Sequence, residues 1–103
     1  MEYRLAPDYE CHPIWAGEGW DYRNVAPGEL PVSQILRDAV ANWGRQYEET
    51  YDKTDPASSG FSSDDREQKF DRAGRELWRR LISELGPEHE VSYFSVVTGW
   101  EVE

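Results

Sequence analysis

The sequence predicts a single α+β domain spanning residues 1–103, in which two antiparallel amphipathic helices pack on a small, mostly antiparallel sheet of N- and C-terminal strands. Two stretches of helical periodicity occupy the middle of the chain, and segments typical of strands lie at both ends. A chain of 103 residues buries roughly two-thirds of the surface that its unfolded form exposes. It is therefore long enough to fold without a disulfide or a structural metal.

The second helix has the clearest sequence pattern, between Ser62 and Pro87. Ser62 or Ser63 can cap its first turn, where carboxylates also favour the positive end of the helix dipole. Gly86 can close the last turn and Pro87 forbids continuation. Apolar residues recur at intervals of three and four, which predicts one buried face: Phe70, Ala73, Gly74, Leu77, Trp78, Leu81, Ile82 and Leu85. Because Gly74 lies on this face, we expect an aromatic ring to pack against it.

The first helix is expected to begin at Leu30-Pro31 and to end near Tyr51 or Asp52, because its apolar residues also follow helical spacing. A connection of turn-forming residues follows, from Lys53 to Phe61, and its length suits two antiparallel helices. Phe61 is placed to act as a hydrophobic staple against the second helix.

Extended segments are predicted at Glu2–Leu5 and Glu10–Ala16 near the N-terminus. After Pro87, Glu90–Val97 is rich in β-branched and aromatic residues and predicts a strand. Thr98-Gly99 can then turn the chain into an alternating segment, Trp100–Glu103. Two strands alone are marginally stable in water, so the N-terminal segments are expected to complete the sheet.

The net charge is −10 and the isoelectric point is about 4.6. Most of this surface would repel a phosphate backbone, so the composition argues against nucleic acids and anionic membranes as partners and favours a basic protein partner. The alternative interpretation is that acidity merely keeps the protein soluble. A local exception is the polar side of the second helix, where Arg72, Arg75 and Arg79 could form an anion-binding or partner-binding ridge, although neighbouring carboxylates can pair with it.

Cys11 is the one cysteine, which excludes an internal disulfide and fits a reducing compartment. The N-terminus shows no basic region followed by an apolar run, and no stretch approaches the length of a membrane span. These features predict a soluble, cytoplasmic protein.

Three side chains could in principle hold zinc or form a nucleophile pair: Cys11, His12 and His89. Their spacing matches no recurring zinc pattern, and adjacent residues of an extended segment point to opposite faces. His89 would lie near Cys11 only if the terminal strands pair in a suitable way. We therefore expect no catalytic residue, no metal site and no cofactor, and a buried structural thiol at Cys11.

The candidate binding residues are aromatic side chains flanked by acids in irregular segments. Trp20 lies within Gly17–Tyr22, which is expected to be a surface loop able to fill a partner's pocket while its carboxylates meet a basic rim. The candidate set is Glu18, Trp20, Asp21, Tyr22 and Trp100. The alternative is that Trp20 folds back and caps the core. Trp43 and Trp78, by contrast, lie on helical core stripes.

A resemblance covers about residues 30–95. The segments Asp55–Phe61, Gly74–Leu77, Glu84–Pro87 and Val91–Phe94 are similar to those of a group of small acidic bacterial proteins of uncharacterised function. In its small size, acidity, aromatic content and lack of catalytic motifs, the chain also resembles immunity proteins that neutralise bacterial toxins by occupying a basic active site.

These observations favour a non-catalytic, acidic protein-binding module. The specific hypothesis is an immunity protein that blocks a basic toxin active site. Two alternatives remain open at the level of sequence. One is a small cysteine-dependent enzyme that uses Cys11 with a histidine, and the other is a homodimer or larger homo-oligomeric scaffold.

Overall fold

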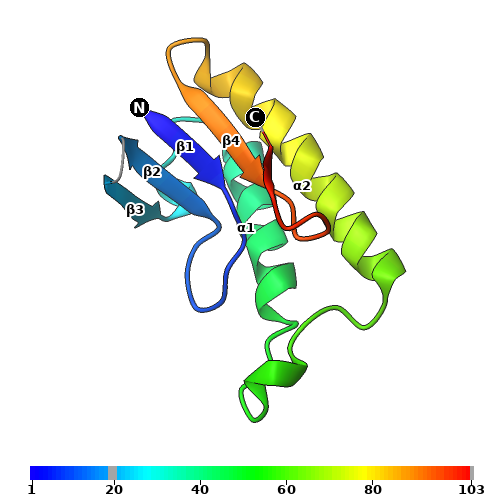
Figure 1. Cartoon of the computed structure of the whole chain (residues 1–103). Helices are drawn as coiled ribbons and strands as arrows, with labels where there is room; N and C mark the ends of the chain where they lie inside the picture. Colours follow the sequence, from blue (N-terminus) through cyan, green and yellow to red (C-terminus); the bar gives the residue numbers. More distant parts are fainter. Residues whose placement is uncertain (19–20, 103) are drawn as a thin grey trace.

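The computed structural model describes residues 1–18 and 21–102 as two helices against one five-stranded sheet (Figure 1). The strands are β1 (Glu2–Leu5), β2 (Ile14–Glu18), β3 (Asp21–Val25), β4 (Glu90–Phe94) and β5 (Glu101–Val102). The helices are α1 (Gln34–Glu48) and α2 (Asp64–Leu85), with short 3₁₀ turns at Pro27–Glu29 and Pro56–Ser58. The α+β prediction is confirmed.

The sheet is mixed, with the strand order β3-β2-β1-β4-β5. β1 pairs in parallel with β4, whereas the other three pairings are antiparallel. The expected sheet of terminal strands is thus only partly correct. The loop predicted over Gly17–Tyr22 is wrong for Gly17 and Glu18, which end β2, and for Asp21 and Tyr22, which begin β3, a further strand at the edge of the sheet. A parallel pair needs a long connection, and here β2, β3 and both helices lie between β1 and β4 in the chain.

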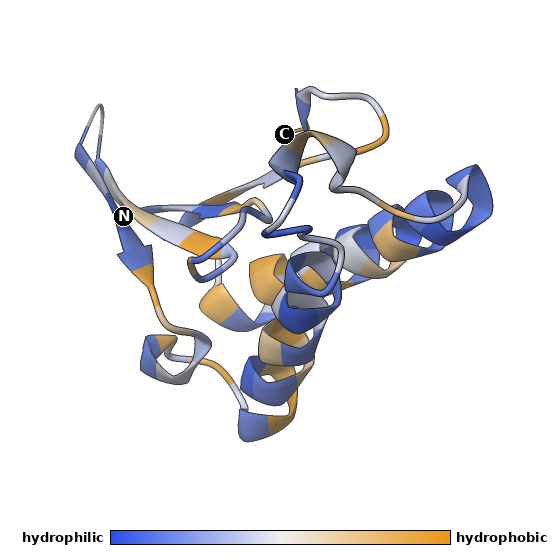
Figure 2. Ribbon diagram, turned by 90° about the horizontal axis from the view of Figure 1, so that it is seen from below, coloured by the Kyte–Doolittle hydropathy of each residue, from blue (hydrophilic) through white to orange (hydrophobic). Residues whose placement is uncertain are grey.

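The helices lie together on one side of the sheet, and α1 and α2 run in opposite directions (Figures 1 and 2). Alternation along β1 sends Tyr3 and Leu5 into the core between sheet and helices. Trp43 from α1, and Phe70 and Leu81 from α2, meet them there. The other face of the sheet carries the alternate residues of each strand, which on β1 are Glu2 and Arg4.

Local sequence explains the ends of α2. The Ser63 hydroxyl accepts a hydrogen bond from the Arg66 amide, so Ser63 rather than Ser62 is the N-cap. Gly86 has a φ of 86°, which a residue with a side chain rarely adopts, and it ends the helix. Gly74 meets the indole of Trp43 and the hydroxyl of Tyr93, so the expected aromatic contact is confirmed.

The first helix is shorter than predicted at both ends. Ser33 caps it by accepting from the Leu36 amide, so Pro31 stays outside the helix. At the other end, the Thr50 amide and hydroxyl both bond to the Tyr47 carbonyl, which closes the last turn before Tyr51. Phe61 packs against Phe70 of α2, so the expected contact with the second helix forms. It is not the predicted staple, because with Ser63 as the N-cap Phe61 lies two residues before the cap.

Candidate functional site

The surface of the sheet opposite the helices gathers charged and aromatic side chains from all five strands. Because Tyr3 and Leu5 point into the core, Glu2 and Arg4 point to the opposite side, and the strand registers carry this alternation across the sheet. We call this surface the open face. Its side chains are Glu2, Arg4, Trp15, Tyr22, Asn24, Glu90, Ser92, Phe94 and Glu101.

A network of contacts joins the open face from β3 to β5. The Tyr22 hydroxyl donates to the Glu2 carboxylate at 2.5 Å. The guanidinium of Arg4 lies 4.9 Å from the centre of the Tyr22 ring, and its Nε donates to Glu101 at 2.9 Å. Ser92 also donates to Glu101, at 2.6 Å. Arg4, on the central strand, therefore links two edges of the sheet.

The electrostatics of the open face are acidic. The hydrogen bonds from Ser92 and then Arg4 outweigh partial burial and hold the pKa of Glu101 below its usual value, so this carboxylate is ionised at neutral pH. The hydrogen bond to Glu2, followed by partial burial, raises the pKa of the Tyr22 hydroxyl. Glu2, Glu90 and Glu101 thus confront one cation, Arg4. A depression of about 450 Å³ lies among these residues.

The predicted binding residues are distributed over the two edges of this sheet. Glu18 and Asp21 are exposed and pair with each other at the end of the β2–β3 hairpin, whereas Tyr22 is half-buried on β3. Asp21 and Tyr22 are strand residues, which corrects the expected loop. Trp100 is 76% exposed beside β5, at the opposite edge. Trp20 lies outside the described residues.

Sequence reasoning missed Glu2, Arg4, Trp15 and Glu101 as members of one surface. Trp15 is half-buried, and its indole donates to the carbonyl of Ala6 at 3.2 Å. The alternation of Glu2–Leu5 does signal a polar face, but only the pairing of β1 with β2 and β4 brings these side chains together.

Cys11 and His89 do not form the suggested pair. The terminal strands do pair, but the parallel register places His89 beside the start of β1, whereas Cys11 lies beyond its end. His89 packs edge-on against Tyr3. Burial, followed by the charges of Asp8 and Glu48, raises the pKa of the Cys11 thiol, which disfavours the nucleophilic thiolate. Within the described ranges, no group of three or more His, Cys, Asp or Glu side chains has the geometry to hold a metal ion.

The arginine ridge of α2 is largely occupied by its own helix. Arg75 donates to Asp71 at 3.0 Å, and Arg79 lies 3.6 Å from Glu76. Arg72 is exposed. Two of the three proposed cations thus already face carboxylates, which weakens the ridge as an anion site.

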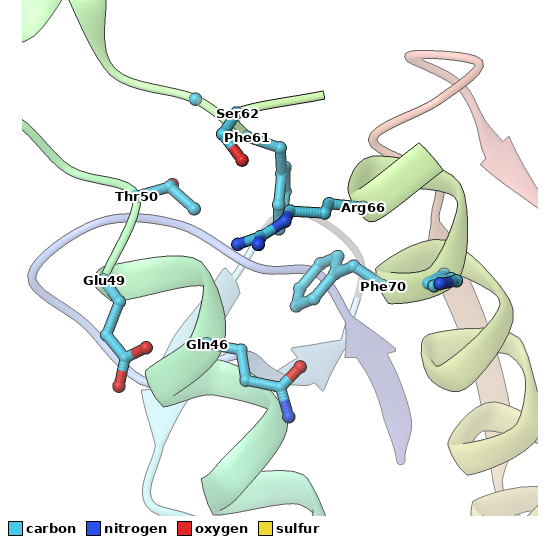
Figure 3. A pocket seen from close by; sticks show the side chains of 9 residues that line it. Gln46, Glu49, Thr50, Phe61, Ser62, Arg66 and Phe70 are labelled. Carbon is cyan, nitrogen blue, oxygen red and sulfur yellow. The ribbon is translucent and has the colours of Figure 1, made fainter. Parts of the chain in front are cut away.

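A separate hollow of about 500 Å³ lies where the C-terminal end of α1 meets the N-terminal end of α2. Phe61 and Phe70 line it, and Arg66 reaches from α2 toward the α1 side (Figure 3). Glu49 borders the same hollow, so its rim carries both signs of charge. The mixed rim gives no charge preference comparable to that of the open face.

The match to a known family covers most of the chain. Residues 1–96 match the sequence model described as Serratia CdiI immunity protein-like. The chain belongs to this family. A comparison with curated proteins found no match. This membership confirms the resemblance to immunity proteins that size, acidity and aromatic content suggested. In the described part of this family member, no helix is long and apolar enough to cross a membrane.

Proposed function

We propose that this protein is an immunity protein that neutralises a basic toxin by binding it, without catalysis, through the open face of the sheet. Membership of the immunity protein-like family is the observation that carries the proposal. The open face supports it, because it combines carboxylates, which attract a basic surface, with Trp15, Tyr22 and Arg4, residue types that are frequent energetic anchors of protein interfaces.

The proposed mechanism has two stages. The charge of −10 attracts a basic toxin from a distance and accelerates encounter. The carboxylates of Glu2, Glu90 and Glu101 then meet cations of the toxin, while aromatic side chains are buried at the contact. Covering a basic active site in this way blocks access of the substrate. Glu18 and Asp21 of the β2–β3 hairpin, and Trp100 at the other edge, are proposed to extend the contact. Trp20, which lies between Glu18 and Asp21 in the sequence, is proposed to take part as well.

We place this action in the cytoplasm, which the single cysteine and the absence of a disulfide framework favour. The raised pKa of the Cys11 thiol and the separation of Cys11 from His89 argue against the cysteine-enzyme alternative. The open face does not require a second copy of the chain as its partner, so we treat the homodimer as an alternative outcome of the binding experiments.

The test uses the protein encoded by the neighbouring gene as the toxin, since toxin and immunity protein are usually encoded together. Isothermal titration calorimetry should show binding, and co-expression should restore growth of cells that produce the toxin. Failure of both would refute the proposal.

Charge reversal locates the binding face. Glu90 is exposed on β4, and Glu90→Lys should weaken binding by about tenfold or more, because like charges meet at the contact. Glu49→Lys makes the same change in charge at an exposed position beside α1, and it should leave the affinity near that of the wild type. Equal loss in both variants would mean that only net charge matters, and the open face would no longer be the proposed site.

A further inference from the structure

Among the described side chains of the open face, Arg4 is the one arginine or lysine, and it lies on the central strand. Its strand, β1, has β2 and β3 on one side and β4 and β5 on the other. The side chain contacts both halves of the sheet, through the Tyr22 ring and the Glu101 carboxylate. A cation in the middle of an acidic surface interrupts the attraction that this surface offers to a basic partner.

These two contacts hold the guanidinium in place before any partner arrives. The Nε atom is engaged by Glu101, and the flat face of the group lies over Tyr22. An arginine side chain normally loses considerable rotamer freedom when it is immobilised in an interface, and a pre-ordered one loses less. The side chain is nevertheless 38% exposed, so part of the guanidinium is accessible to a partner.

A fixed, partly exposed guanidinium is well suited to a carboxylate. Its parallel N–H groups match the two oxygens of Asp or Glu, and such charge-assisted pairs are stronger and more directional than pairs of neutral groups. The surrounding carboxylates of Glu2, Glu90 and Glu101 favour cations at neighbouring positions. The open face therefore displays a pattern of charge and not a uniform negative field.

We infer that Arg4 is the specificity-determining residue of the open face, and that it receives a carboxylate of the partner protein framed by basic side chains that meet Glu2, Glu90 and Glu101. The inference rests on the proposed function and adds the chemistry of the partner surface. A basic protein without an acid at the matching position would leave the Arg4 guanidinium facing a cation, and it would be rejected.

The competing explanation is that Arg4 only neutralises its neighbours. The two explanations predict changes of opposite sign. If Arg4 is only a neutralising charge, its removal makes the protein more acidic and strengthens binding to a basic partner. If Arg4 contacts a carboxylate, its removal leaves that carboxylate unpaired in the interface and weakens binding through faster dissociation.

The experiment measures association and dissociation rates with the product of the neighbouring gene. Arg4→Gln should weaken binding by about tenfold, mainly through the dissociation rate. Arg72→Gln, which removes the same charge from an exposed position on α2, should bind as the wild type does or slightly more tightly. The double variant Arg4→Gln with Glu49→Gln keeps the wild-type net charge, changes no carboxylate of the open face, and should still bind weakly.

Thermal unfolding checks that each variant is folded. If Arg4→Gln does not fold, Arg4→Lys gives the decision, because it keeps the charge but loses the planar fork, and it should bind more weakly than the wild type. If the wild type binds the toxin and Arg4→Gln binds equally or more tightly, the inference about Arg4 is wrong while the proposed function stands. Absence of wild-type binding overturns the proposed function, and self-association in sedimentation that depends on Arg4 would identify a second copy as the partner.

Discussion

Gly74→Ala tests the packing of α2 against the rest of the fold. A methyl group at this position would lie 2.5 Å from the Trp43 ring and 2.5 Å from the Tyr93 hydroxyl oxygen. Both distances are far below van der Waals contact. Trp43 is 2% and Tyr93 0% exposed, so neither ring has free space into which it can move.

The magnitude follows from two opposing effects. Replacing glycine by alanine inside a helix contributes about 1 kcal/mol of stability. Overpacking a tight core costs about 1–3 kcal/mol, and displacing the Tyr93 hydroxyl also disturbs its 2.7 Å hydrogen bond to buried Asp71, which costs about 1–3 kcal/mol. The two costs overlap, and we predict a net loss of about 2 kcal/mol. For a domain of this size, that loss lowers the unfolding temperature by roughly 10 °C.

Urea denaturation followed by circular dichroism and tryptophan fluorescence measures the effect. The matched control is Ala73→Gly at the neighbouring exposed position, which should cost only about 1 kcal/mol because it changes helix propensity without touching the core. A Gly74→Ala protein that is more stable than the wild type would refute the described contact between α2, Trp43 and Tyr93.

Three further predictions concern single side chains. Burial alone would raise the pKa of Asp71, but hydrogen bonds from Tyr93, Arg75 and Ser95 outweigh burial and lower it. The stability that Asp71 contributes is therefore present above its unfolded pKa and is lost as the pH falls through its folded pKa. Asp71→Asn should therefore unfold more easily at pH 7 and lose less stability than the wild type on acidification below about pH 4, as urea titrations across pH would show. The Cys11 thiol should react slowly with a maleimide at pH 7 and faster above pH 9, because its pKa is raised, and fast labelling at pH 7 would restore the cysteine-enzyme alternative. Trp100→Ala should change the free energy of unfolding by less than about 0.5 kcal/mol, because the side chain is exposed. The same substitution should weaken binding to the toxin, and an unchanged affinity would place Trp100 outside the interface.

The helices could be predicted because their signals are local. The cap at Ser63, most of the apolar stripe and the stop at Gly86 depend on residues within a few positions of one another. Two residues predicted on the buried face, Ala73 and Ile82, are exposed, so the prediction is wrong for them. The contact at Gly74 was also predictable, since a glycine on an apolar stripe indicates close approach. The strand Glu2–Leu5 was found with its observed bounds, because it alternates polar and apolar residues.

The sheet and the binding surface depend on pairings that the local sequence does not encode. Asp21–Val25 is mostly polar, as an edge strand with a solvent-exposed face can be, and its composition is typical of a loop. The parallel register of β1 with β4 decides that His89 lies away from Cys11. The same register brings Arg4 next to Ser92, and the pairing of β5 with β4 brings it near Glu101, which is 97 positions away in the sequence. Such long-range neighbours require the fold.

Hydrogen–deuterium exchange of the complex tests the central claim most directly, namely that the open face is the binding surface. On addition of the neighbouring gene's product, amide exchange should become slower in peptides that cover β1, β3 and β4. Peptides that cover α1 and α2 should exchange at nearly the same rate in the complex as in the free protein. Protection confined to the helices, with unchanged exchange in these strands, would contradict the account.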